Sequence, residues 1–196
     1  MVKDPVMGRV KTRLAREIGA VAATSFYRAA ARAVVGRLSG DTRWQTLLAV
    51  APDTAVASPF WPSHVTRHGQ GQGDLGQRMQ AIMQWAGPGP IVIVGTDIPA
   101  IRPSHIAAAF RALGSHDAVL GPAPDGGYWL VGLARSPRVL TPFGTVRWSS
   151  ADTLADTRAN LAGHAIACIA ELNDIDDAAS FRAVTAWYGR RVLPLP

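Results

Sequence analysis

The sequence has very little cysteine. Its 196 residues include one, Cys168, so an internal disulfide and a cysteine-based metal cluster are both excluded. Cys168 lies within the apolar run His164–Ala170, so we expect an inert, buried thiol rather than a nucleophile.

Long apolar runs are also absent. No stretch approaches the roughly 20 residues that a membrane-spanning helix needs, and Met1–Pro5 lacks the apolar segment of a signal peptide. We therefore expect a cytoplasmic protein without a membrane span. A hydrophobic content of 48% and a charged content of 17% exclude a disordered chain. The length suits one core, and we predict a single domain over residues 1–196.

Lysine is nearly missing although the chain is basic, with a net charge of +6. There is no basic stripe with interleaved aromatic residues and no zinc-finger spacing, so a nucleic acid polymer is not an expected partner. One local cluster of cations is present: Lys3, Arg9, Lys11, Arg13 and Arg16. Gly8 lets the backbone of this segment approach a ligand, which favours a phosphate cradle. A solvated basic terminus explains the cluster equally well.

The stretch from Ile91 to Pro99 indicates a binding site. Ile91–Val94 is a run of β-branched residues, typical of a central parallel strand buried on both faces. Asp97 follows directly, and Pro99 keeps a helix from starting there. Open α/β sheets bind ligands just beyond the carboxyl ends of their strands, so we expect Asp97 to contact a ligand or metal. The alternative is that Asp97 only caps the next helix.

Two glycine-rich loops are further candidates. Gly69–Gly76 precedes an amphipathic helix, and its backbone amides and glutamine side chains could surround a nucleotide. An ordinary linker capped by Asp74 fits the same spacing. Asp125–Gly127 is a turn between two strands and needs no function as a hairpin. Its position would bring Asp125 to the same sheet edge as Asp97.

Acidic residues gather near the C-terminus, between Glu171 and Asp177. Asp174 and Asp176 alternate, so both point to one side of an extended segment. Mg²⁺ is held by one or two carboxylates together with substrate phosphates, and Asp97 plus one of this pair meets that requirement. These acids would also suit the start of a final helix, Ala178–Tyr188.

The remaining pattern alternates helices and strands and predicts an α/β fold. Helices are expected at 20–38, 75–83, 104–113 and 148–163, the last with a Ser149–Asp152 capping box. Strands are expected at 44–50, near Val65, and at 117–122, 128–133 and 165–169.

Six ordered blocks, which span nearly the whole chain, resemble a known family. They are Lys3-x-Pro5-x-x-Gly8-Arg-Val-Lys-Thr-Arg-Leu14, Gln70-Gly71-x-Gly73-Asp74-Leu75-Gly76-x-Arg78-Met79, Gly95-Thr96-Asp97-x-Pro99, Gly121-Pro-Ala-x-Asp125-Gly126-Gly127-Tyr128, Trp148-Ser149-Ser150 and Asp174-x-Asp176. The sequence thereby resembles the small GT-A-type transferases known as radical-SAM/selenodomain-associated, or arsenosugar-biosynthesis, glycosyltransferases. These belong to the nucleotide-diphospho-sugar transferase superfamily.

The resemblance implies a three-layer α/β/α sandwich with a mainly parallel central sheet, the GT-A fold. It also implies a nucleotide sugar donor, a small-molecule acceptor, and Mg²⁺ or Mn²⁺ as cofactor. By position, the implied nucleotide-binding residues are Gly8, Arg9, Lys11, Arg13, Gly71, Gly73, Asp74 and Thr96. The implied metal ligands are Asp97 and Asp176. The implied acceptor-binding residues are Asp125, Gly126, Gly127, Tyr128 and Trp148. Lys11, Arg13 and Asp97 would assist catalysis, with Asp125 as base.

Two departures from the family pattern stand out. Only Met1 and Val2 precede the Lys3-x-Pro5 loop, so the first strand is expected to be truncated, and Asp177 stands where the family usually has Thr. Two other functions fit the same residues. A nucleotidylyltransferase would use a nucleoside triphosphate and a phosphorylated acceptor, as guanylyltransferases and cytidylyltransferases do, and a non-catalytic nucleotide-binding protein would need neither.

Overall fold

The computed structural model describes residues 1–182 of the protein. Its strands are β1 (Val2–Lys3), β2 (Leu47–Ala51), β3 (Thr66–Gly69), β4 (Ile91–Val94), β5 (Ala118–Pro122), β6 (Tyr128–Leu133) and β7 (Ile166–Cys168). Its helices are α1 (Thr12–Ile18), α2 (Ala20–Ser39), α3 (Leu75–Trp85), α4 (Pro103–Ala112) and α5 (Thr153–Ala159), with a 3₁₀ turn η1 (Asp53–Ala55). Of the expected last helix, Ala178–Tyr188, residues 178–182 are helical and the rest lies outside the described residues.

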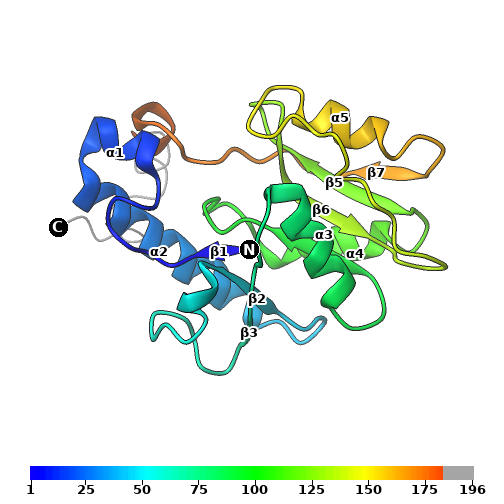
Figure 1. Ribbon diagram of the computed structural model, residues 1–196, viewed down its shortest axis with the longest axis horizontal. Coiled ribbons are helices and arrows are strands. Elements are labelled where there is room, and N and C mark those ends of the chain that lie inside the picture. Colours follow the sequence, from blue (N-terminus) through cyan, green and yellow to red (C-terminus); the bar gives the residue numbers. More distant parts are fainter. Residues whose placement is uncertain (183–196) are drawn as a thin grey trace.

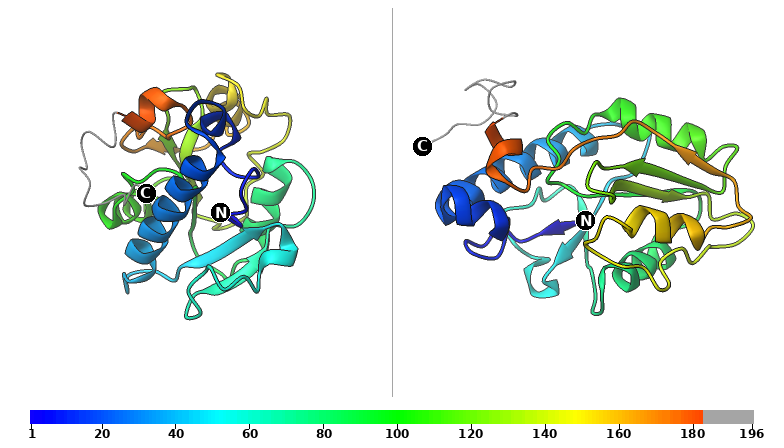
Figure 2. Two further views of the ribbon diagram at one scale, coloured as in Figure 1. Left: turned by 90° about the vertical axis from the view of Figure 1, so that its left-hand side faces the viewer. Right: turned by 90° about the horizontal axis from the view of Figure 1, so that it is seen from above.

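The strands form two hydrogen-bonded groups, and Figure 1 shows the group of β1, β2 and β3 beside the group that contains β5, β6 and β7. In the first group, β1, β2 and β3 are all parallel. In the second, the order is β4-β6-β5-β7, where β6 runs antiparallel to both neighbours and β7 is parallel to β5. Helices α2 and α4 cover one side of the strands, and α3 and α5 cover the other (Figure 2). The expected three-layer α/β/α arrangement is confirmed.

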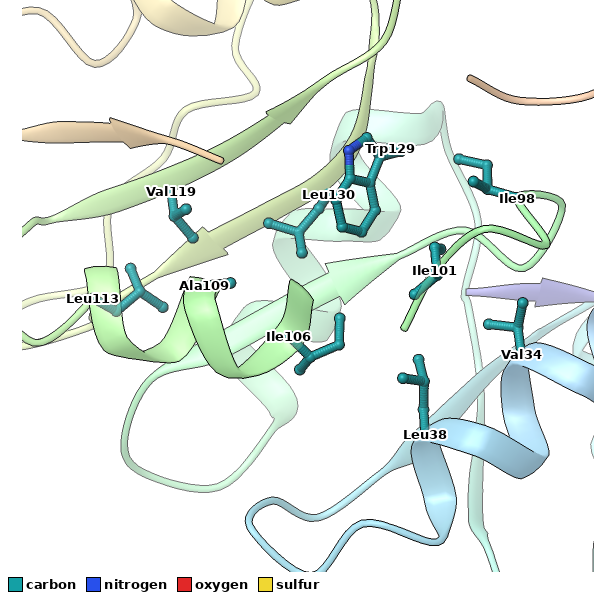
Figure 3. Packing of buried hydrophobic residues seen from close by; sticks show 10 residues of the cluster. All are labelled: Val34, Leu38, Ile98, Ile101, Ile106, Ala109, Leu113, Val119, Trp129 and Leu130. Atoms are coloured by element: carbon teal, nitrogen blue, oxygen red, sulfur yellow. The ribbon is translucent and has the colours of Figure 1, made fainter. Parts of the chain in front are cut away.

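Successive side chains of the strands in the second group point to opposite sides of the sheet, and each side packs against its own layer of helices. Val119 and Leu130 face α4 and the end of α2, where they meet Ile106, Ala109 and Leu38 (Figure 3). Their neighbours in sequence, Leu120 and Val131, face the opposite side and pack against α3. Full burial of such side chains contributes about 1.5–3 kcal/mol each, so the two cores fix the strands in register.

The first strand is short, as the sequence predicts. Strand β1 has two residues and is paired with β2, while the Met1 amino group donates to the Val94 carbonyl oxygen at 2.7 Å. Beyond Met1, the edges of β2 and β4 face each other across a groove of about 540 Å³, lined by residues such as Leu47, Ala49 and Val92. The prediction that Ile91–Val94 is a central parallel strand is therefore wrong for this structure. Strand β4 pairs with β6, antiparallel, and its other edge lines the groove.

Strand β2 begins at Leu47 rather than at Trp44. The Trp44 indole donates to the Leu38 carbonyl oxygen at 3.0 Å, and its ring stacks on Phe110 at 6.1 Å between centroids. These contacts hold Trp44 against the ends of α2 and α4, outside the strand.

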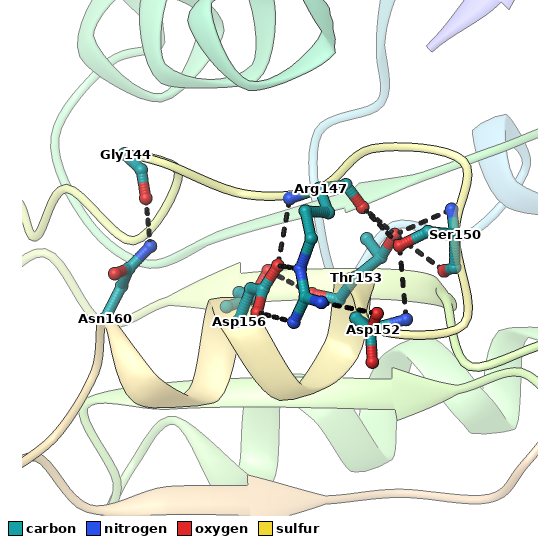
Figure 4. A network of polar contacts seen from close by, with 8 residues as sticks. Gly144, Arg147, Ser150, Asp152, Thr153, Asp156 and Asn160 are labelled. Carbon is teal, nitrogen blue, oxygen red and sulfur yellow. Dashed lines mark hydrogen bonds and ion pairs between the residues drawn. The ribbon is translucent and has the colours of Figure 1, made fainter.

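Two local predictions near the C-terminal half are also wrong. Ser149 does not form a capping box with Asp152: it has a positive φ of 57°, and α5 starts without a side-chain cap. Instead Arg147 holds the start of α5 through Asp156 and Asp152, and Thr153 and Ser150 return hydrogen bonds to the Arg147 carbonyl oxygen (Figure 4). Cys168 is exposed rather than buried, because β7 lies at the end of its sheet.

Candidate functional site

Three carboxylates from distant parts of the sequence meet in the structure. Asp97 lies in the loop that follows β4, and Asp174 and Asp176 lie in the extended segment that follows β7. One oxygen of each lies within 4.8 Å of the others. The alternation of Asp174 and Asp176 explains this, because Ile175 between them points the other way and is buried among residues of α1 and α2.

Backbone contacts hold the extended segment in place. The amide of Leu172 donates to the Pro122 carbonyl oxygen at 3.2 Å, and the Trp129 indole donates to the Ala170 carbonyl oxygen at 3.0 Å. On the other side, the Asp97 carboxylate folds over Gly95. A Cβ atom at Gly95 would lie 2.9 Å from Asp97 Oδ1, so the missing side chain permits this position.

Lys11 lies among these acids and is almost fully buried, with 5% of its side chain exposed. Its Nζ donates to Asp97 Oδ2 at 3.0 Å and to Asp176 Oδ1. Burial alone would lower the pKa of Lys11, but the two carboxylates together outweigh it and raise that pKa above its ordinary value. Lys11 is therefore a charged ammonium that bridges an acid from mid-chain and an acid from near the C-terminus.

Arg13 adds a second cation at the solvent side of the cluster. Its guanidinium lies 3.7 Å from Asp176 Oδ2, and 71% of its side chain is exposed. An ion pair so exposed contributes little to stability. The side chain is therefore free to take other partners at small cost.

The carboxyl of Asp174 has a pKa above its ordinary value. Burial, followed by the charge of Asp176, raises the pKa of Asp174 to about 6, although Lys11 acts in the opposite direction. Asp97 and Asp125 contribute to the same rise. The site thus concentrates more negative charge than its cations balance, as expected for a place that receives another cation.

The cluster opens into a pocket of about 510 Å³. Six residues predicted from the sequence line it: Lys11, Arg13, Thr96, Asp97, Tyr128 and Asp176. Of these, Thr96 is buried and contacts the Tyr27 hydroxyl. Tyr128 receives a hydrogen bond from the Thr157 hydroxyl at 3.4 Å, and burial raises its pKa to about 12, so it stays protonated.

The predicted phosphate loop stands beside this pocket. Gly8 and Arg9 lie in an exposed turn, closed by a hydrogen bond from the Arg9 amide to the Val6 carbonyl oxygen at 3.0 Å. Gly8 has a φ of 78°, and a Cβ atom there would meet nothing within 4 Å. The backbone of the turn is thus open on its outer side to a bound molecule.

In the glycine loop before α3, several groups already have partners within the protein. Gly71 donates to Asp53 Oδ1 at 3.1 Å, and Asp74 forms a capping box with Gln77. Gly73 takes a φ of 99° next to the Gln77 side chain. The Gln70 amide donates to the carbonyl oxygens of Val2 and Ala49, both at 2.9 Å, and so joins β1 to β2. The Gln70 side chain thus has partners within the protein and also lines the pocket.

The predicted acceptor residues occupy the turn between β5 and β6 and the loop before α5. Asp125 accepts a hydrogen bond from the Gly127 amide at 2.9 Å and is exposed. Gly126 has a φ of 82°, and its carbonyl oxygen accepts from the Leu154 amide at 2.9 Å. Trp148 packs over Phe143, with ring centroids 6.2 Å apart, and over Gly76 of α3.

Sequence reasoning missed several pocket residues, among them Tyr27, Arg78 and Ser149. Tyr27 of α2 points into the site, where its hydroxyl exchanges hydrogen bonds with the backbone of Lys3 at 2.9 and 3.0 Å. Arg78 and Ser149 also line the pocket. Tyr27 fits the helical pattern as a core residue, so no signal in the sequence sets it apart. Arg78 lies within one of the six sequence blocks that resemble the known family, so that block could have indicated it as a pocket residue.

The donor set suits a hard divalent cation. Mg²⁺ and Mn²⁺ prefer oxygen ligands, and here three carboxylates converge while a buried ammonium contacts two of them. A site that already accommodates a cation between Asp97 and Asp176 has the charge and the spacing for such an ion. The residues present therefore fit the cofactor that the sequence resemblance implies.

Comparison with known structures defines the fold class. A crystal structure of a proposed nucleotide-diphospho-sugar transferase from Desulfovibrio desulfuricans G20 matches with 28% sequence identity and a TM-score of 0.86, covering 96% of this chain and 87% of that chain. Weaker matches are the Rv0371c protein of Mycobacterium tuberculosis H37Rv, with 16% identity, a TM-score of 0.54 and coverage of 81% and 84%, and its homologue from Mycobacterium sp. strain JC1, with 15% identity, a TM-score of 0.55 and coverage of 85% and 84%. The chain has the GT-A-like fold of nucleotide-diphospho-sugar transferases.

The family is shown by a sequence model. Residues 34–150, more than half of the chain, match the family DUF2064, described as an uncharacterized protein conserved in bacteria, and the protein belongs to this family. No curated protein matches the chain. Within the described residues, no helix combines the length and the apolar character that crossing a bilayer requires.

Proposed function

We propose that the protein is a metal-dependent transferase that acts on a nucleotide-activated donor, and more narrowly a glycosyltransferase that uses a nucleotide-diphospho-sugar. One observation carries the proposal. Asp97 and Asp176, which are far apart in the sequence, share Lys11 and lie with Asp174 at the edge of a pocket of about 510 Å³. The likeness to the Desulfovibrio protein supports the same class of reaction.

In this proposal the diphosphate of the donor lies between the acidic cluster and the cationic turn. Asp97 and Asp176, with Asp174 beside them, would hold Mg²⁺ or Mn²⁺. When bound, the ion neutralises charge on the diphosphate. Gly8, Arg9, Lys11 and Arg13 would contact the phosphates, while Thr96 and the loop of Gly71, Gly73 and Asp74 would lie toward the nucleoside. These residues act by positioning and by stabilising charge.

The acceptor would enter from the side of β5 and β6, along Gly126, Gly127, Tyr128 and Trp148. Its hydroxyl oxygen forms a bond to the anomeric carbon of the sugar, and the bond from that carbon to the diphosphate breaks. The nucleoside diphosphate leaves with the bonding electrons. The hydroxyl proton passes to Asp125, which is exposed and close enough to influence the titration of Asp174.

We place the protein nearest to the radical-SAM/selenodomain-associated glycosyltransferases, on the strength of the six sequence blocks that resemble them. A nucleotidylyltransferase would use the same metal, cations and loops, but would attack an α-phosphate and release pyrophosphate. The two activities differ in the donor that binds best, so ligand binding separates them.

The test is calorimetry with UDP-glucose, GDP-mannose, GTP and CTP, each with and without Mg²⁺. We expect a nucleotide sugar to bind more tightly than the parent triphosphate, and only with Mg²⁺ present. Pyrophosphate release from a triphosphate and a phosphorylated acceptor would favour the nucleotidylyltransferase instead. Equal nucleotide affinity with and without Mg²⁺ would contradict both activities.

A substitution ties the binding to the proposed residues. Asp97→Asn should abolish Mg²⁺-dependent nucleotide binding without unfolding the protein. Asp41→Asn makes the same change at a carboxylate that pairs with Arg43 outside the pocket and should leave binding unchanged. Equal nucleotide affinity in the Asp97→Asn variant and the unaltered protein would remove Asp97 from the site.

A further inference from the structure

The Lys11 ammonium already occupies the space where the acidic cluster would hold a metal ion. Its Nζ contacts oxygens of Asp97 and Asp176, two of the three carboxylates that converge there. With 5% of its side chain exposed, Lys11 is a buried cation rather than a surface residue. The cluster is therefore partly neutralised by the protein itself.

A divalent ion and this ammonium would compete for the same oxygens. Mg²⁺ binds carboxylate oxygens directly at about 2.1 Å, and an ammonium within hydrogen-bond distance of the same oxygens would then lie only a few ångströms from the ion. Two positive charges so close repel each other, and the burial of the Lys11 side chain leaves little water around its ammonium to weaken that repulsion. Lys11 cannot keep both contacts once the metal is bound.

We infer that Lys11 exchanges partners: it is the counter-ion of Asp97 and Asp176 in the metal-free protein, and it turns to the diphosphate of the ligand when a divalent cation replaces it. The inference rests on the proposed metal site. Lys11 stands on the loop between the Gly8 turn and α1, next to the exposed Arg13. A diphosphate bound at this loop provides the anion that the displaced ammonium needs.

This exchange makes the binding of the metal and the binding of the diphosphate positively cooperative. Metal alone must push a buried ammonium away from its carboxylates without offering it a new partner. The diphosphate supplies that partner, so each ligand raises the affinity for the other. Lys11 then neutralises the carboxylates of Asp97 and Asp176 in the metal-free protein. It also keeps the affinity for metal low unless the donor is bound.

The test compares Mn²⁺ binding by the unaltered protein, Lys11→Met and Arg111→Met, followed by the loss of the free-ion paramagnetic resonance signal. Arg111 is an exposed cation of α4 that does not line the pocket. We expect Lys11→Met to bind Mn²⁺ alone at least about tenfold more tightly than the unaltered protein. With UDP present, the gain in Mn²⁺ affinity should be large for the unaltered protein and Arg111→Met and small for Lys11→Met.

A second measurement needs no variant. Protein labelled with ¹³C-lysine gives signals from the two lysines of the sequence, and Mg²⁺ with UDP should shift the signal of the Lys11 side chain. Equal Mn²⁺ affinity in Lys11→Met and the unaltered protein, or an unmoved Lys11 signal at saturating Mg²⁺, would overturn the exchange while keeping the metal site. Failure of every protein to bind Mn²⁺, with or without UDP, would overturn the proposed function as well.

Discussion

At the scale of single residues, the raised pKa of Asp174 makes the stability of the folded protein depend on pH. Its carboxyl has a raised pKa of about 6 in the folded protein, against an ordinary value of 3.8. The folded state therefore binds this proton more tightly than the unfolded state. That contribution to stability is complete below the ordinary pKa and is lost as the pH rises through the folded value.

We expect Asp174→Asn to stabilise the metal-free protein near neutral pH, because the asparagine carries no charge to bury beside Asp176. The gain should be about 1–2 kcal/mol after allowance for partial exposure to solvent. Urea denaturation with a chelator present, at about pH 7.5 and about pH 4.5, measures it. The gain should shrink at the lower pH, and a gain of equal size at both would contradict the raised pKa.

Gly126 is the residue whose replacement should harm the fold most directly at the acceptor turn. It has a φ of 82°, and a Cβ atom there would collide with the backbone of Ala151. We expect Gly126→Ala to reduce the free energy of unfolding by about 1–3 kcal/mol.

Gly36 is the matched control for that substitution. It lies within α2, and a Cβ atom at this position would meet nothing within 4 Å. Gly36→Ala should stabilise the protein by about 0.5–1 kcal/mol, since alanine suits a helix interior better than glycine. Thermal unfolding of both variants gives the comparison, and a loss of the same size in each would show that the collision at Gly126 is relieved.

At the scale of secondary-structure elements, a groove between β2 and β4 separates the two strand groups. Residues of both edges line the groove together with Met1, whose amino group donates to the Val94 carbonyl oxygen. Burial of the Met1 amino group lowers its pKa to about 6, from an ordinary value of 8.0. The unfolded chain binds this proton more tightly, so stability should rise as the pH increases from about 6 to about 8.

Extending the chain before Met1 by about five β-branched residues should raise the melting temperature. The added strand can run between β2 and β4 and pair with both edges, and the buried charge is replaced by an amide. Thermal unfolding measures the effect. An extension of equal length made of glycine and serine removes the same charge without favouring a strand, so equal melting temperatures of the two extended proteins would contradict the pairing.

The elements also show how far the sequence alone predicts the structure. Helix α2 follows from the helical spacing of its buried residues, and strands β5 and β6 are short runs whose residues are buried in succession. Trp44 and Ser149 were misassigned, because distant partners, Phe110 and the Arg147 network, decide their positions. Asp97 and Asp176 could be chosen from strand ends and resemblance. The gathering of Asp174 and Tyr27 around Lys11 depends on tertiary packing that no local pattern encodes.

At the scale of the whole molecule, the single domain over residues 1–196 stays a prediction. Helix α2 joins both strand groups, because Val34 and Leu38 pack with α4, β5 and β6, and other residues of the same helix pack with β1 and β2. We therefore expect one cooperative unfolding transition, with near-ultraviolet and far-ultraviolet circular dichroism changing together. Two separate transitions would show that the strand groups unfold independently.

The proposed cation site of Asp97 and Asp176 is tested directly by a crystal of the protein grown with Mn²⁺ and UDP. Anomalous diffraction from manganese locates the ion without assumptions about the ligand. We expect one strong peak bonded to carboxylate oxygens of Asp97 and Asp176 and to the diphosphate, with the Lys11 Nζ moved onto a phosphate oxygen. A manganese peak elsewhere, or UDP bound away from these two carboxylates, would contradict the assignment.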